Sequence, residues 1–191
     1  GKVGKGVRYE MLRYETRQST ARPPAPFITS SLQIAASNQL SFSAQRTMRI
    51  AQDLYEGLAL GKEGQVGLIT YMRTDSTNIS TEAMDMVRGY VKKDIGPEYL
   101  SKEPKVYTSA NKDAQEAHEA IRPTDVSRHP DKIKPLLKGP RAEEQYKLYK
   151  LIWSRFVACQ MAPAKWTGKT VFFERADQKT GAVVKATGRT L

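Results

Sequence analysis

Cysteine is almost absent from this 191-residue sequence, in which Cys159 is the only one. The chain therefore cannot form an internal disulfide, a pattern typical of reducing compartments. We expect a cytoplasmic protein in which Cys159 is a packed thiol without a catalytic role. The sequence also lacks a signal peptide and any apolar run of 18 residues, so we expect no membrane partner.

Closely spaced aspartates are missing as well. No two aspartates lie nearer in sequence than Asp125 and Asp131. Magnesium is a hard cation that needs several converging oxygen ligands, and scattered surface carboxylates do not supply them. The sequence therefore predicts no metal site within this chain.

Acidic residues are outnumbered by basic ones. The chain has 31 Lys and Arg against 20 Asp and Glu, a formal net charge of +11. This balance favours a polyanionic partner such as nucleic acid or, less often, an anionic membrane, although a merely soluble basic protein is the simpler alternative. The apolar content of 39% is enough to bury a core, so we expect a folded protein.

Strand periodicity occurs at both ends of the chain. Residues 7–17 alternate apolar and polar side chains with one slip at Met11 and Leu12, which predicts a bulged strand. From Trp166 onward, two alternating runs flank the polar segment 176–181, which predicts a hairpin. The proline-rich residues 22–27 mark a boundary after the first strand.

Helical periodicity dominates the middle of the chain. Ser30 and Gln33 have capping-box spacing, and further helices are predicted from Ser43, from Ser80, and between Arg141 and Pro163. Residues 58–65 are typical of a glycine-bearing loop, residues 66–70 of a short buried strand, and residues 114–121 carry helix formers.

These patterns predict an α+β fold. The two ends, residues 1–21 and 163–191, would pair in one small β-rich domain, and residues 22–162 would form a mainly helical domain inserted between them. We assign no role to the 58–65 segment.

The segment 67–80, GLITYMRTDSTNIS, combines a tyrosine with an arginine and several hydroxyls. Side chains of an extended segment alternate, so Tyr71 and Arg73 would face the same way and could meet one phosphodiester. A phenol, with a pKa of about 10, needs help from positive charge or a base to act as a nucleophile. Arg73 supplies such a charge and can bind phosphate oxygens bidentately.

Three hydroxyl side chains follow this arginine at Thr74, Ser76 and Thr77, and they are candidate phosphate donors. A short Tyr-x-Arg pattern also arises by chance, in which case Tyr71 is an amphipathic strand-end residue and Arg73 pairs with Asp75 at the surface. His118 is open to the same two interpretations, as a phosphate contact or proton carrier or as a polar helix residue.

Four blocks decide between these interpretations. YMRTDST, PPAPFITSSLQ, EAHEAIRPT and LIWSRFVACQMAPA together resemble the bacterial DNA topoisomerase I family of type IA topoisomerases, in the order that this family has. The resemblance covers about Tyr9 to Leu191 and corresponds to an interior portion of the family's enzyme.

The resemblance implies residue roles. Tyr71 would attack one DNA strand and become joined to its 5′ phosphate, Arg73 would contact the scissile phosphate, and His118 would be the active-site histidine. Residues 22–162 would correspond to helical domain III, the moving gate, and the flanking segments to part of the β-rich domain II.

The resemblance also implies partners. The family's Mg²⁺ is bound by a TOPRIM domain outside this chain, and a separate domain IV holds single-stranded DNA. We therefore expect the chain, a monomer, to act with the remaining topoisomerase domains in relaxing negative supercoils and to be inactive alone. A noncatalytic nucleic-acid-binding module is the main alternative, while a tyrosine recombinase, which needs several arginines and a histidine around its tyrosine, fits these blocks poorly.

Overall fold

The chain divides into two compact units, one formed by Gly1–Arg22 with Pro163–Leu191 and the other by Pro23–Ala162. The computed structural model describes residues 6–107, 118–177 and 181–191. The three long antiparallel strands form the first unit, and the helices, with one short strand pair, form the second, so the expected α+β class is confirmed.

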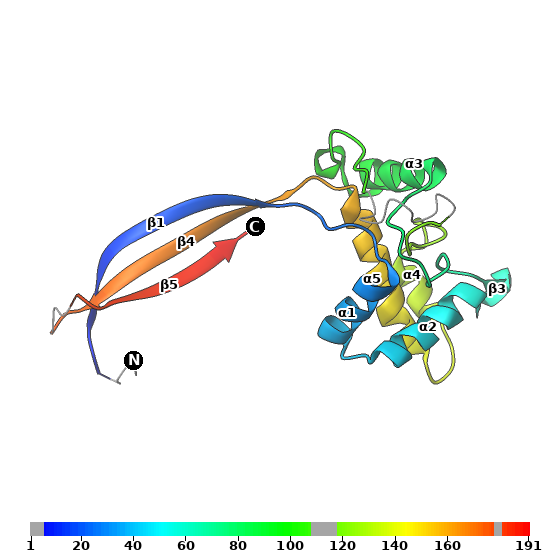
Figure 1. The fold of residues 1–191 in the computed structure, drawn as a ribbon, viewed down its shortest axis with the longest axis horizontal. Coiled ribbons are helices and arrows are strands. Elements are labelled where there is room, and N and C mark those ends of the chain that lie inside the picture. The colour runs from blue at the N-terminus through cyan, green and yellow to red at the C-terminus, as the bar shows by residue number, and fades with distance from the viewer. Residues whose placement is uncertain (1–5, 108–117, 178–180) are drawn as a thin grey trace. The chain divides into compact units, whose positions relative to one another are not determined.

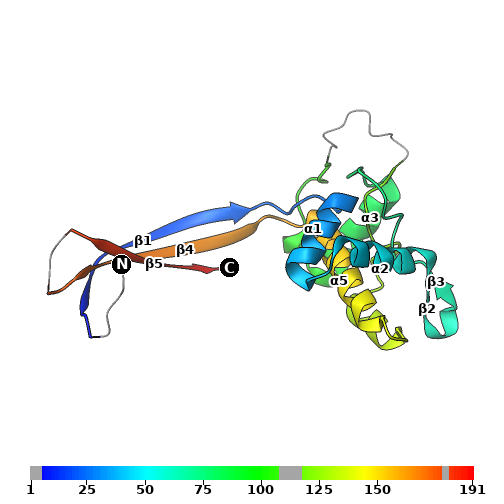
Figure 2. The same ribbon diagram turned by 60° about the horizontal axis from the view of Figure 1, so that its bottom comes forward.

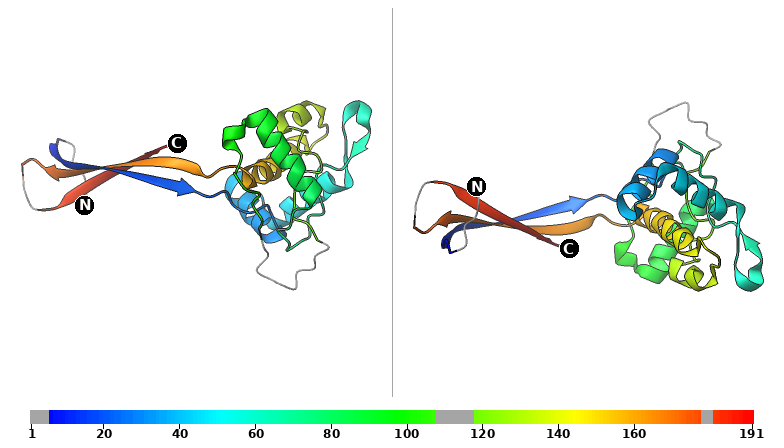
Figure 3. Two further views of the ribbon diagram at one scale, coloured as in Figure 1. Left: turned by 90° about the horizontal axis from the view of Figure 1, so that it is seen from above. Right: turned by 90° about the horizontal axis from the view of Figure 1, so that it is seen from below.

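The first unit is a three-stranded antiparallel sheet with the order β1-β4-β5 (Figure 1). Its strands are β1 (Tyr9–Ala21), β4 (Ala164–Arg175) and β5 (Val183–Thr190). The views in Figure 3 show the same three strands side by side. Both termini of the chain thus enter one sheet, as their period-two patterns predicted.

The register of this sheet contains the predicted irregularity. Tyr9 pairs with Arg175 and Ala21 with Ala164, and the register shifts between Met11 and Arg13. An extra residue in one strand of an antiparallel pair produces such a bulge. The slip in alternation at Met11 and Leu12 therefore marked a real feature of the strand.

The second unit is mainly helical. Its longer helices are α1 (Thr29–Leu40), α2 (Ala44–Glu56), α3 (Thr81–Tyr90) and α5 (Ala142–Cys159), with a short α4 (Pro130–Ile133). A π-helical turn, Val91–Ile95, continues α3, and 3₁₀ turns cover Gly61–Glu63, Pro97–Tyr99 and Lys134–Leu136. Helix α5 packs against α1, α2 and α4, so it forms the centre of this unit.

The buried face of α5 is the apolar stripe that the sequence predicts. Tyr149, Ile152 and Phe156 are fully buried, and the polar atoms on this face have partners. The Tyr149 hydroxyl donates to the carbonyl of Arg128 at 2.7 Å, and the Trp153 indole N–H donates to that of Val126 at 2.9 Å. Because buried aromatic polar atoms are costly without partners, these bonds fix where the 126–128 segment crosses α5.

Helix starts follow the expected caps in two cases and depart from them in one. Ser43 and Ser80 accept hydrogen bonds from the amides of Arg46 and Ala83, so α2 and α3 begin where predicted. Ser30 does not cap α1, which begins at Thr29. A tertiary contact decides this start, because the Thr29 amide donates to the carbonyl of Thr74.

The 58–65 segment is more ordered than the loop expected there. Strands β2 (Leu58–Ala59) and β3 (Gln65–Val66) form a short hairpin, which Figure 2 shows at the C-terminal end of α2. Leu60 is buried in the core, and Glu63 forms a salt bridge with Arg128 at 2.8 Å. The expected strand over 66–70 is correspondingly wrong: beyond Val66 only Ile69 makes a bridge, to Pro123.

The helix indicated by the helix formers at 114–121 is not found in the part of this range that the structure describes. Residues 114–117 lie outside the described part of the chain, and His118–Ala120 are not helical. Ile121 and Pro123 instead make single β-bridges to Phe27 and Ile69. Pairing with two distant segments takes precedence here over local helix propensity.

Cys159 lies at the end of α5 and is fully buried, in keeping with a packed thiol. Burial raises the pKa of its thiol to about 12, so the thiol is not reactive at neutral pH. None of the helices among the described residues is long and apolar enough to cross a membrane.

Candidate active site

The segment 71–76 alternates exposed and buried side chains. Tyr71 is 45% exposed and Arg73 is also exposed, whereas Met72 between them is fully buried. The alternation continues with Thr74 and Ser76, which are buried. Although the segment is not a regular strand, anchoring of every second side chain in the core holds Tyr71 and Arg73 at the surface.

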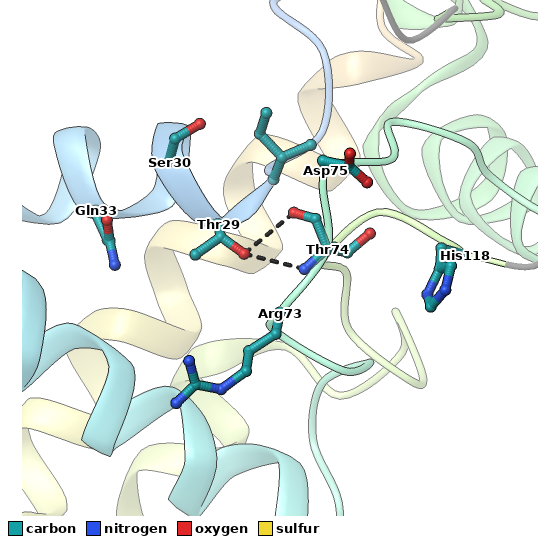
Figure 4. Close-up of a pocket in the computed structure, with 8 residues that line it drawn as sticks. Thr29, Ser30, Gln33, Arg73, Thr74, Asp75 and His118 are labelled. Carbon is teal, nitrogen blue, oxygen red and sulfur yellow. Dashed lines mark hydrogen bonds between the residues drawn. The ribbon is translucent and has the colours of Figure 1, made fainter. Parts of the chain in front are cut away.

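The N-terminal turn of α1 holds this segment from one side. The Thr29 hydroxyl donates to the carbonyl of Met72 at 2.8 Å and accepts from the amide of Thr74 at 3.0 Å. The Thr29 amide donates to the carbonyl of Thr74 at 2.9 Å, and Figure 4 shows the Thr29 side chain facing the backbone of Thr74. Thr29 thus brackets Arg73, which lies between its two partners.

The segment around His118 is held to the same region by Thr70. The Thr70 hydroxyl donates to the carbonyl of Ala120 at 2.7 Å and accepts from the amide of Arg122 at 3.0 Å. The Thr70 amide donates to the carbonyl of Arg122 at 2.9 Å. These bonds bring His118 into the same region as Tyr71, although the two residues are 47 positions apart in the sequence.

Two adjoining pockets result. The Arg73 pocket has a volume of about 500 Å³ and is lined by Ile28, Thr29, Ser30, Gln33, Arg73, Thr74, Asp75 and His118. The Tyr71 pocket has a volume of about 380 Å³ and is lined by Tyr55, Ile69, Thr70, Tyr71, Thr74, His118, Glu119 and Thr124. Thr74 and His118 line both, so the pockets meet at these two side chains.

The predicted pair Tyr71 and Arg73 is therefore divided between the two pockets. Both side chains are exposed, but each lines its own pocket. In Figure 4, Arg73 and His118 lie on opposite sides of Thr74 and do not point at each other. A phosphodiester reaching all three would have to span the junction at Thr74.

The candidate hydroxyl donors have internal partners. The Thr74 hydroxyl accepts from the amide of Ser76 at 3.1 Å, and the Ser76 hydroxyl accepts from that of Asn78 at 3.1 Å. The Thr77 hydroxyl donates to the carbonyl of Tyr107 at 3.1 Å. Because Ser76 is fully buried, its expected place as an exposed phosphate donor is corrected: it shapes the loop behind Arg73.

Arg73 is available for an anion. Among the salt bridges within residues 6–107, 118–177 and 181–191, none involves Arg73, so the expected alternative of an Arg73–Asp75 ion pair is not formed. The first turn of α1 lines the same pocket through Thr29 and Ser30. A helix N-terminus carries partial positive charge, which adds to that of the guanidinium.

Glu119 is the acidic side chain of the Tyr71 pocket, and it is fully engaged. One carboxylate oxygen accepts from the Ser80 amide at 3.0 Å, and the other forms a salt bridge with Arg122 at 2.6 Å. Partial burial raises the pKa of Glu119, but the bonds from Ser80 and Arg122 outweigh burial and leave the pKa below its ordinary value. Glu119 is therefore ionised, and its carboxylate links the start of α3 to the 118–122 segment.

The described residues do not fit a magnesium ion. Within the part of the chain that the structure describes, no three His, Cys, Asp or Glu side chains are grouped closely enough to hold a metal. Glu119, the carboxylate that lines the Tyr71 pocket, already pairs with Arg122.

The residues of this site that sequence patterns missed include Thr29, Thr70, Glu119 and Tyr55. Thr29 and Thr70 act through hydrogen bonds to segments more than 40 positions away, so no local pattern marks them. Tyr55 lies off the buried face of α2, and its ring contacts that of Tyr71 with a centroid distance of 5.2 Å. A tyrosine on the exposed side of an amphipathic helix was the one available signal.

Comparison with known proteins places these features in a family. The family model described as DNA topoisomerase matches residues 2–191. The chain is 47% identical to the DNA topoisomerase 1 of Xylella fastidiosa over 175 residues, which are 92% of this chain and 21% of that protein. It is 47% identical to the DNA topoisomerase 1 of Escherichia coli over 185 residues, which are 97% of this chain and 19% of that protein.

A solved structure agrees with the sequence relatives. The full-length topoisomerase I of Thermotoga maritima matches with a TM-score of 0.73 and 36% identity, over 97% of this chain and 28% of that one. The chain thus spans about a fifth of the length of the curated relatives that it matches. On these grounds the chain belongs to the bacterial DNA topoisomerase I family, the type IA DNA topoisomerases.

Proposed function

We propose that this chain supplies the nucleophile for single-strand DNA cleavage and religation. The phenol of Tyr71 loses its proton and attacks a phosphodiester, the Oη–P bond forms, the P–O3′ bond breaks, and the 3′ oxygen leaves as a hydroxyl. Attack by that hydroxyl on the 5′-phosphotyrosyl bond reverses the step. The observation that carries the proposal is an exposed Tyr71 beside His118 in a member of this family.

Arg73 and His118 would bind the phosphate at the junction of the two pockets. The Arg73 guanidinium has no competing salt bridge with another described residue, and its planar fork suits two phosphate oxygens. His118 is exposed and lines both pockets, so its imidazole can reach a phosphate oxygen from the opposite side. Charge that grows on these oxygens during attack would be stabilised between the two side chains.

Of the three hydroxyl side chains predicted to contact DNA, only Thr74 is kept in this proposal. This residue lines both pockets, whereas Ser76 is buried and Thr77 is bonded to Tyr107. The net charge of +11 supports a single-stranded DNA partner.

The activity of the whole protein extends beyond this chain. We propose that a full-length protein containing it relaxes negative supercoils in the cytoplasm as a monomer, with unit Pro23–Ala162 as the moving domain III gate and the sheet unit as part of domain II. Magnesium would be bound by a TOPRIM domain outside the chain, as the resemblance to the family implies.

The proposal is tested by trapping the covalent intermediate. Full-length protein containing this chain is mixed with 3′-end-labelled single-stranded DNA and stopped with denaturant, and the labelled peptide is mapped by mass spectrometry. We expect the 5′ phosphate on Tyr71. An adduct on another tyrosine would contradict the assignment, and DNA binding without any adduct would favour the noncatalytic module.

Replacing Arg73 by lysine tests the phosphate contact. Arg73→Lys keeps the charge but loses the bidentate fork, so we expect cleavage or religation to slow by roughly ten- to a hundredfold. Single-turnover rates of both steps provide the measurement. Arg49→Lys is the matched control, because Arg49 is an exposed arginine of α2 that lines neither pocket. Equal rates for the Arg73→Lys and Arg49→Lys variants would refute a geometric role for Arg73.

A further inference from the structure

The ring of Tyr55 lies against the ring of Tyr71. Their centroids are 5.2 Å apart with an angle of 61° between the ring planes, an edge-to-face arrangement that aromatic pairs prefer. Both rings are partly exposed, Tyr55 at 40% and Tyr71 at 45%. The pair therefore lies in the wall of the Tyr71 pocket, outside the buried core.

Within the described part of the chain, no hydrogen bond or salt bridge orients the Tyr71 side chain. The hydrogen bonds among the described residues include none from the Tyr71 hydroxyl, whereas the partly buried Tyr107 and the fully buried Tyr149 both donate to carbonyls. A half-exposed phenol without such a bond is free to occupy several side-chain rotamers. The neighbouring Tyr55 ring limits that choice.

The backbones that carry the two rings are fixed to each other. The Leu68 amide donates to the carbonyl of Leu54 at 2.7 Å, which joins the last turn of α2 to the segment that leads to Tyr71. Gly67 packs so closely that a Cβ added there would lie 2.8 Å from the Tyr55 carbonyl oxygen. The Thr124 hydroxyl donates to the carbonyl of Gly67 at 2.8 Å and holds this contact from the other side.

We propose that Tyr55 is a positioning residue for Tyr71. Its ring holds the Tyr71 phenol in the orientation that faces the pocket shared with His118, so that a bound phosphodiester meets the hydroxyl. The Tyr55 hydroxyl takes no part in this, because the contact is between rings. This inference rests on the proposed function, in which Tyr71 is the nucleophile.

A positioning role for Tyr55 predicts an effect on the cleavage rate and none on DNA affinity. Loss of the ring widens the set of Tyr71 orientations without removing a group that binds the DNA backbone. The rate of cleavage at saturating DNA should therefore fall, while DNA affinity stays unchanged. Aromatic pairs contribute modestly, so we expect the rate to fall by about three- to tenfold.

The experiment compares three variants of the full-length protein that contains this chain. Tyr55→Ala removes the ring, Tyr55→Phe keeps it, and Tyr99→Ala is the matched control, because Tyr99 is a half-exposed tyrosine of the same unit that does not line the Tyr71 pocket. Single-turnover cleavage of a labelled single strand, DNA affinity and melting temperature are measured for each. We expect slower cleavage for Tyr55→Ala alone, with wild-type behaviour for the other two.

Each other outcome contradicts the role. Wild-type cleavage by Tyr55→Ala would exclude positioning, and equal defects in Tyr55→Ala and Tyr55→Phe would assign the effect to the hydroxyl. Weaker DNA binding with an unchanged saturating rate would make Tyr55 a DNA contact. Failure of the proposed function is distinguishable, because a Tyr71→Phe protein would then still form the adduct.

Discussion

A Tyr71→Phe protein is expected to fold normally and to form no covalent DNA adduct. The substitution removes only the hydroxyl, which is the attacking group and has no hydrogen-bond partner among the described residues. The ring contact with Tyr55 remains. We therefore expect a change in unfolding free energy within about 0.5 kcal/mol, as for other surface substitutions, and loss of supercoil relaxation to below detection.

The measurement uses the full-length protein, with a gel relaxation assay, a denaturant-trapped adduct assay and thermal unfolding run in parallel. Tyr99→Phe is the control, since it removes a hydroxyl from a half-exposed tyrosine outside both pockets. If the Phe variant at position 71 still relaxed negatively supercoiled DNA, Tyr71 could not be the nucleophile. Loss of the fold together with activity would leave a structural role as the explanation.

Gly67→Ala is expected to lower both stability and activity. The new Cβ would lie 2.8 Å from the Tyr55 carbonyl oxygen, closer than real Cβ contacts, and the atom that it meets is backbone. The segment must therefore move away from α2 and strain the Leu68–Leu54 hydrogen bond. Overpacking of this kind costs about 1–3 kcal/mol. Tyr71 is four residues further along and would move with this segment. Because small misplacements of reacting groups slow a reaction strongly, we also expect cleavage to slow by roughly tenfold or more.

Gly89→Ala provides a control of opposite sign. Gly89 lies inside α3, and apart from its chain neighbours and the helix's own backbone, no described atom is within 4 Å of the Cβ that would be added there. Alanine is favoured over glycine in a helix by up to about 1 kcal/mol, so this variant should be more stable than the wild type. Thermal and denaturant unfolding of both variants measures the difference. A Gly67→Ala protein as stable as the wild type would show that the backbone contact with Tyr55 relaxes freely.

Local sequence patterns predicted most of the regular structure. The apolar stripe of α5, the serine caps of α2 and α3, and the bulged strand β1 each depend on neighbours within a few positions. Such signals are readable because periodicity and capping act over one or two turns. The pairing of the chain's two ends was also predictable, since each end lacked another sheet to join.

Patterns failed where distant segments compete with local preference. Helix formers after residue 113 predicted a helix, but Ile121 and Pro123 pair with Phe27 and Ile69. Residues 66–70 were predicted to form a strand, but Thr70 makes its hydrogen bonds with the 120–122 segment. The start of α1 moved to Thr29 because that residue binds the backbone around Arg73.

The sequence by itself indicated that Tyr71 and Arg73 face the same way, because every second side chain of an extended segment does so, and the intervening Met72 is buried. Only the tertiary structure decided what surrounds them. Hydrogen bonds from Thr29 and Thr70 bring together α1, the 71–76 segment and His118, and they divide the site into two pockets. The Tyr55–Tyr71 ring pair likewise exists because the last turn of α2 packs on Gly67, a contact between backbones that side-chain patterns do not record.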